Sequence, residues 1–72
     1  MQQFVINQNQ QANGDYEVHN LTTPCRWMPS PQNQISLGIH LHCGYAVQEA
    51  KARWPGNRIN GCAYCCPACH TS

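Results

Sequence analysis

Two adjoining C-x-x-C pairs, Cys62/Cys65 and Cys66/Cys69, stand near the end of this 72-residue chain. They constrain the fold more than any other feature, because a chain this short has little else to stabilise it. A domain of about 60 residues buries only about 60% of the surface that its unfolded chain exposes. Chains shorter than roughly 80 residues therefore rely on disulfides, a metal ion or a partner. We expect one domain, residues 1–72, that depends on such a cross-link.

The six cysteines fit two kinds of cross-link. In a secreted mini-protein, an even number of cysteines indicates disulfides. The chain opens with Met1-Gln2-Gln3 and lacks the basic segment and apolar run of a signal peptide. It also lacks an apolar stretch of transmembrane length. We therefore expect a cytoplasmic protein that contacts no membrane. Thiols stay reduced there, which favours metal over disulfides. Zinc is the predicted cofactor.

The charge of the chain is nearly balanced, with four basic residues against three acidic ones. Proteins that bind the phosphate backbone of nucleic acids carry a basic stripe or patch, and none is visible here. Nucleic acid is therefore a weakly supported partner, and a protein is the predicted one.

An antiparallel hairpin is predicted for the first part of the chain, with residues 3–8 pairing with residues 15–20. Asn13-Gly14 lies between the two segments and is a strong turn signal, because both residues tolerate positive φ. Strand alternation places Glu17 and His19 on the same face of the second segment.

A loop, a strand and a helix are expected next. The segment 21–31 contains three prolines, which exclude regular structure, so it forms a loop that presents Cys25. Residues 34–42 alternate in the strand period. Residues 45–54 are rich in helix-forming side chains, and the helix stops at Pro55-Gly56. The predicted buried face of the strand consists of Ile35, Leu37, Ile39 and Leu41.

These elements predict an α+β fold: a small antiparallel sheet, one helix and a C-terminal zinc knuckle. Residues 1–14, rich in Gln and Asn, supply the first strand and its turn. Residues 61–70 supply the cysteine cluster.

The metal ligands are predicted to come from widely separated segments. A C-x-x-C turn directs two thiolates at one ion, and structural zinc takes four ligands in tetrahedral geometry. The candidates are Cys25, Cys62, Cys65, Cys69, His19, His70 and Cys43.

Three ligand assignments remain open. The first joins the Cys62/Cys65 pair to Cys25 and to either His19 or a C-terminal residue, Cys69 or His70. The second is a zinc ribbon built from His40, Cys43, Cys66 and Cys69, and the third binds two ions. We favour the first, because a cross-link that closes a long loop stabilises the folded state most.

Several of these residues also have simpler interpretations. Cys66 fits a free thiol as well as a ligand. Cys43 fits a small buried residue, a disulfide partner of Cys69 or a ligand of a second zinc ion. His40 and His42 are expected to face solvent. The large aromatic residues are expected to pack in the core rather than to form a stacking platform for nucleic-acid bases. These are Trp27, Tyr45, Trp54 and Tyr64.

The spacing of several motifs resembles a family of small Cys/His-rich bacterial proteins. The shared pattern is Asn13-Gly14-Asp15 before Glu17-Val18-His19, then Cys25, Leu37-Gly38, Cys43, Gly61-Cys62, Tyr64-Cys65 and Cys69-His70. The layout is also distantly similar to the metal-binding N-terminal domain of bacterial DNA-alkylation repair regulators. That resemblance implies that Cys25, Cys62 and Cys65 are ligands. It puts His19 where another thiolate is expected, which argues against methyl transfer.

The predicted function is that of a small domain with a structural zinc ion that acts as a protein-interaction module. The chain has three carboxylates, Asp15, Glu17 and Glu49, and no pair of them suits acid–base catalysis, so no enzyme activity is expected. Two alternatives remain: a zinc-thiolate or redox-active thiol protein, acting as an alkyl acceptor or sensor, and a disulfide-stapled secreted mini-protein.

Overall fold

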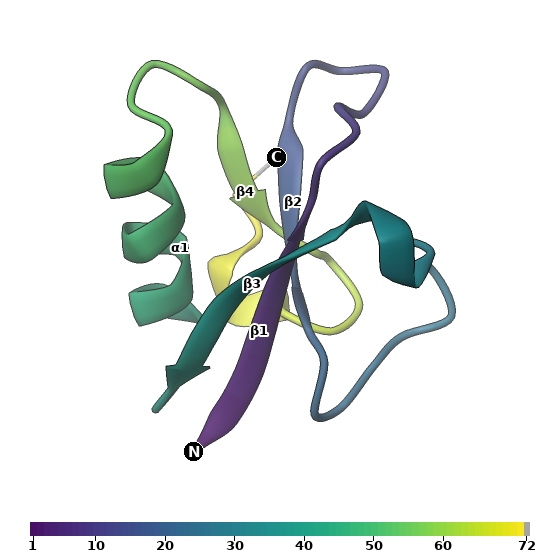
Figure 1. Cartoon of the computed structure of the whole chain (residues 1–72), viewed down its shortest axis with the longest axis vertical. Coiled ribbons are helices and arrows are strands. Elements are labelled where there is room, and N and C mark those ends of the chain that lie inside the picture. The colour runs from purple at the N-terminus through teal and green to yellow at the C-terminus, as the bar shows by residue number, and fades with distance from the viewer. Residues whose placement is uncertain (72) are drawn as a thin grey trace.

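A four-stranded sheet carries one helix in the computed structural model, which describes residues 1–71 (Figure 1). The α+β class predicted from the sequence is confirmed. The strand order in the sheet is β3-β1-β2-β4. The elements are β1 (Gln2–Asn7), β2 (Tyr16–Asn20), β3 (Gln34–His40), α1 (Cys43–Arg53) and β4 (Ile59–Gly61), with short 3₁₀ turns at Pro31–Asn33 and Pro67–Cys69.

The predicted hairpin forms, with β1 and β2 antiparallel. Gly14 in the connection has a φ of 95°, a conformation that glycine adopts without steric cost. Val18 pairs with Ile6 and faces the helix, while His19 pairs with Val5 on the opposite face. Strand alternation therefore gives the sheet two distinct sides, one for the apolar core and one for His19.

Strand β4 is a correction to the predicted sheet, in which all strands were antiparallel and residues after 56 formed a turn-like connection. Ile59–Gly61 instead pairs in parallel with β2, with Val18 opposite Gly61. A three-residue strand shows no periodicity of its own, and its partner lies some 40 residues earlier in the chain. The sheet is thus mixed, and the cysteines that follow β4 lie close to β2.

Strand β3 forms but ends at His40, two residues before the predicted end, and the apolar side chains of residues 34–42 do not all share one buried face. Leu37 is buried, whereas Ile39 and Leu41 are exposed. The pairing of β3 with β1 shifts register between Phe4 and Val5, and Gly38 there has a φ of 86°. Such a bulge interrupts the alternation, so residues beyond it turn outward.

The helix begins two residues earlier than predicted, at Cys43. The Nδ1 atom of His42 accepts a hydrogen bond from the backbone N–H of Gly44 and caps the helix. The buried side chains of the helix are those of Cys43, Ala46 and Ala50. Because these are small, the helix lies close to the Phe4, Ile6 and Val18 side of the sheet.

The expectation that the large aromatic residues pack inside is wrong for three of them. Trp27, Tyr45 and Tyr64 have exposed fractions of 59%, 49% and 70%, and Trp54 packs only partly against the core. Phe4 and the aliphatic side chains already fill the narrow space between the sheet and the alanines of the helix.

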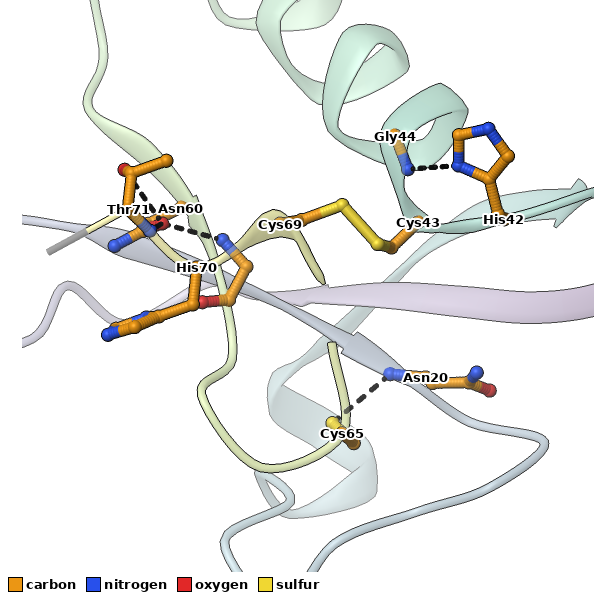
Figure 2. Close-up of a disulfide and its surroundings, with 10 residues drawn as sticks. Asn20, His42, Cys43, Gly44, Asn60, Cys65, Cys69, His70 and Thr71 are labelled. Carbon is orange, nitrogen blue, oxygen red and sulfur yellow. Dashed lines mark hydrogen bonds between the residues drawn. A yellow bond between two sulfur atoms is a disulfide. The ribbon is translucent and has the colours of Figure 1, made fainter. Parts of the chain in front are cut away.

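A disulfide joins Cys43, the first residue of α1, to Cys69 in the last 3₁₀ turn, with the two Cα atoms 6.3 Å apart (Figure 2). The C-terminal segment is held a second time by Asn60. Its Oδ1 atom accepts hydrogen bonds from the backbone N–H and the hydroxyl of Thr71, at 3.0 and 3.2 Å. The end of the chain is thus attached both to the helix and to β4.

Replacing Gly61 by alanine is expected to lower the free energy of unfolding by about 1–3 kcal/mol through overpacking. A Cβ atom at this position would lie 2.7 Å from the Cβ of Cys69 and 2.8 Å from its backbone carbonyl carbon. Urea denaturation measures the loss. Gln48→Ala is the control, since Gln48 is an exposed residue of α1. Equal stability of the two variants would contradict the tight contact.

The Cys43→Ser/Cys69→Ser double variant is expected to lose about 3 kcal/mol of stability, because the disulfide closes a loop with a sequence separation of 26 residues. Thermal unfolding of the variant should match that of the reduced wild-type chain. A reductant should leave the variant unchanged; a further drop in its melting temperature would show that another disulfide stabilises the fold.

Candidate metal centre

Four side chains from three segments converge on the face of the sheet opposite the helix. His19 comes from β2, Cys25 from the following loop, and Cys62 and Cys65 from the segment after β4. Their ligand atoms all lie within 4.8 Å of one another. His19 and Cys62 are each 1% exposed, so the group is enclosed on its inner side.

The spacing of the four ligand atoms suits a tetrahedral ion. A Zn–S bond of about 2.3 Å implies sulfur atoms about 3.8 Å apart at two corners of a tetrahedron. The sulfurs of Cys25 and Cys62 are 3.7 Å apart. The Nδ1 atom of His19 lies 3.8 Å from the sulfur of Cys25 and 3.4 Å from that of Cys65. A metal ion with three sulfur ligands and one nitrogen ligand fits these distances.

Backbone N–H groups support two of the sulfurs. The N–H of Tyr64 donates to Cys62 at 3.4 Å, inside the C-x-x-C turn. The N–H of Asn20, at the end of β2, donates to Cys65 at 3.3 Å (Figure 2). Hydrogen bonds of this kind are stronger to a charged acceptor. Both therefore favour the thiolate form that a metal requires.

Glu17 orients the ring of His19. Its Oε1 atom lies 3.3 Å from the Nε2 atom of His19, so an N–H at Nε2 donates to the carboxylate and the lone pair remains at Nδ1. Metal-binding histidines commonly have such a carboxylate partner, which fixes the ring and raises its basicity. Burial raises the pKa of the Glu17 carboxyl, while the hydrogen bond with Gln11 acts in the opposite direction. The position of Glu17 two residues before His19, on the same strand face, is the signal in the sequence for this role.

Two of the four candidate ligands, Cys62 and Cys65, are thiols whose surroundings do not activate them, whereas a hydrogen bond with Cys65 lowers the pKa of the neighbouring Cys66 in the core. Burial raises the pKa of Cys62 to about 12. The hydrogen bond with Cys66, followed by burial, raises the pKa of Cys65. At neutral pH such thiols hold their protons unless a cation replaces them. The environment thus favours a metal centre over a free thiolate nucleophile.

The other predicted ligands lie elsewhere. Cys43 and Cys69 are bonded to each other, and the Nδ1 atom of His70 lies 3.0 Å from the carbonyl oxygen of Gly61. Cys66 packs in the apolar core. Within residues 1–71, no second group of three or more histidine, cysteine or acidic side chains converges. Of the three assignments, the structure brings together the first, with His19 as its fourth member.

The zinc-ribbon alternative also depended on His40, and this residue lies apart from the group. Its Nε2 atom is 2.6 Å from the carbonyl oxygen of Leu37, while Cys43 belongs to the disulfide.

Comparison with known proteins finds no matching family model, no matching curated protein and no matching solved structure. In the part of the chain that the structure describes, no helix has the length and apolar character needed to cross a membrane.

Glu17→Gln is expected to weaken Zn²⁺ binding by about tenfold or more, because the amide cannot raise the basicity of His19 as a carboxylate does. Competition with a chromophoric chelator measures the affinity. Glu49→Gln is the matched control, since Glu49 is an exposed carboxylate on α1. Equal affinities for the two variants would show that Glu17 does not support the ligand.

Proposed function

We propose that His19, Cys25, Cys62 and Cys65 bind one structural zinc ion and that the chain is a protein-interaction module. The observation that carries this proposal is the tetrahedral spacing of three sulfurs and one ring nitrogen, together with the carboxylate behind that ring. Zinc suits the donor set best, because mixed thiolate and imidazole sites of this geometry are typical of it.

The role of the ion is structural, because four protein ligands complete its coordination and leave no position for a substrate. The ion would connect β2, the loop after it and the segment after β4. Cys25 and Cys62 are 37 residues apart. A cross-link between them closes a long loop, and such cross-links stabilise the folded state most. A small sheet with few buried side chains needs this support.

An interaction role is supported by the surface rather than by the centre. Several large apolar side chains are exposed, although a chain of this size has few large apolar residues with which to build its core. They are Met1, Trp27, Ile39, Leu41, Tyr45 and Tyr64. Aromatic residues are enriched where proteins contact one another.

A second candidate, a redox-responsive thiol protein, is favoured by one observation. The Cys43–Cys69 disulfide packs in the same cluster as the free thiol of Cys66. Disulfides persist in oxidising compartments and are rare in the cytoplasm. The zinc proposal keeps the same disulfide, so oxidising conditions follow for either candidate, in contrast to the cytoplasmic location expected from the sequence. The buried, high-pKa thiol of Cys62 weighs against the alkyl-acceptor variant of the same idea.

Native mass spectrometry of the chain purified without added metal tests the leading proposal. We expect one zinc ion per chain, lost on acidification, and a mass two hydrogens lighter than the fully reduced chain because of the disulfide. Cys25→Ser should lose the ion. Cys66→Ser should keep it, since Cys66 is not among the four ligands.

Three results would overturn the structural-zinc proposal: retention of the ion by Cys25→Ser, two ions per chain, or a metal-free chain six hydrogens lighter. Rapid alkylation of the zinc-loaded Cys66→Ser chain by iodoacetamide would instead identify an activated thiolate among the three remaining free cysteines.

A further inference from the structure

Asparagine followed by glycine occurs twice in the chain, at Asn13-Gly14 and at Asn60-Gly61. In this dipeptide the backbone nitrogen of the glycine can attack the side-chain amide carbon of the asparagine, because glycine has no Cβ atom to block the approach. The two motifs share the same intrinsic chemistry. A difference between their reactivities therefore has to come from their surroundings in the fold.

Asn13 lies where this reaction is open. It is exposed in the connection between β1 and β2, outside the paired strands. Its Oδ1 atom accepts a hydrogen bond from the backbone N–H of Asp15 at 2.9 Å, a local bond that folds the side chain back over the Gly14 peptide. The amide carbon is thus brought toward the nitrogen that attacks it. The N–H of Gly14 donates to the carbonyl oxygen of Gln11 at 2.9 Å, which makes the reaction slower than in an unfolded chain.

Asn60 lies where the same reaction is closed. It belongs to β4 and is 5% exposed. Its Oδ1 atom accepts hydrogen bonds from the N–H of Gly61 and from the N–H and hydroxyl of Thr71 (Figure 2). Its Nδ2 atom donates to the carboxylate of Asp15 at 3.3 Å. Both ends of the amide are held, and Cys69 packs closely against Gly61. Attack and hydrolysis at Asn60 therefore require local unfolding.

Exposure alone does not make an asparagine reactive in this way. Asn9 is exposed in the same connection as Asn13, but Gln10 follows it. The side chain of Gln10 hinders the approach of its backbone nitrogen to the amide carbon. Of these three asparagines, Asn13 is the one that combines exposure with a following glycine.

We infer that Asn13 is a site of spontaneous covalent modification, at which the side-chain amide is lost while that of Asn60 is kept. A bond forms between the Gly14 nitrogen and the Asn13 Cγ atom, the Cγ–Nδ2 bond breaks, and ammonia leaves with the proton of the Gly14 N–H. Solvent water then opens the resulting succinimide at either carbonyl carbon and gives aspartate or isoaspartate. One water is consumed, one ammonia is released, and nothing is oxidised or reduced.

The products change the turn in two ways. Either product adds one negative charge, so the formal charge of the chain falls from +1 to zero. Aspartate keeps an oxygen that can accept the N–H of Asp15. Isoaspartate instead routes the backbone through the former side chain and lengthens a turn that is closed by the N–H of Gly14 on Gln11 and the N–H of Gln11 on Asp15.

The test is incubation of the folded full chain at mildly alkaline pH, followed by mass spectrometry of tryptic peptides after reduction of the disulfide. Trypsin separates the motifs, because Arg26 ends the peptide that contains Asn13 and Arg58 precedes the one that contains Asn60. Fragment spectra locate the exchange of the amide NH₂ for a hydroxyl. We expect Asn13 to react at least about tenfold faster than Asn60, which reacts only after local opening. Asn9 should stay intact.

Denaturation supplies the control. In urea with a reductant, Asn13 and Asn60 should react at similar rates, since the fold no longer separates them. Asn13→Gln should remove the modification from the first peptide and leave the rate at Asn60 unchanged. An Asn13 that stays intact in the folded chain but reacts in urea would overturn the inference. Equal rates at Asn13 and Asn60 in the folded chain, or loss of the Asn9 amide as fast as that of Asn13, would also overturn it.

Discussion

The contact of His19 with Glu17 on one side and with two cysteine sulfurs on the other is the interaction on which the rest of the structure depends. His19 is almost fully buried in the sheet, and a buried polar ring is costly unless both nitrogens have partners. Glu17 satisfies one nitrogen from the same strand. The other nitrogen faces sulfurs supplied by the loop after β2 and by the segment after β4, so satisfying one residue fixes the path of two distant segments.

The disulfide and the proposed metal centre lie on opposite faces of the sheet. On the helix side, the disulfide joins the start of α1 to the last 3₁₀ turn, and small side chains let the helix approach the strands. On the other side, four ligand atoms gather the loop and the C-x-x-C turn around β2. The adjoining C-x-x-C pairs contribute to both faces, because Cys62 and Cys65 belong to the candidate metal group while Cys69 belongs to the disulfide.

Features with a local pattern could be predicted from the sequence, and features created by distant contacts could not. Alternation and the Asn13-Gly14 turn predict the hairpin, and the C-x-x-C spacing indicates Cys62 and Cys65 as ligands. Strand β4 depends on its partner β2, and the exposure of Ile39 depends on the bulge at Gly38. The sequence did not decide which residue is the fourth member of the group. The folded sheet places His19 beside the sulfurs, whereas His70 contacts the carbonyl oxygen of Gly61.

The division of the cysteines has a consequence for how the chain would mature. Six thiols can pair in many combinations during oxidation. An ion bound first by Cys25, Cys62 and Cys65 acts as a protecting group, since coordinated sulfurs are withheld from exchange. Oxidation is then restricted to Cys43, Cys66 and Cys69, of which Cys43 and Cys69 are bonded in the folded chain. Metal supply before oxidation would thus reduce the possible single disulfides to the three that these cysteines can form.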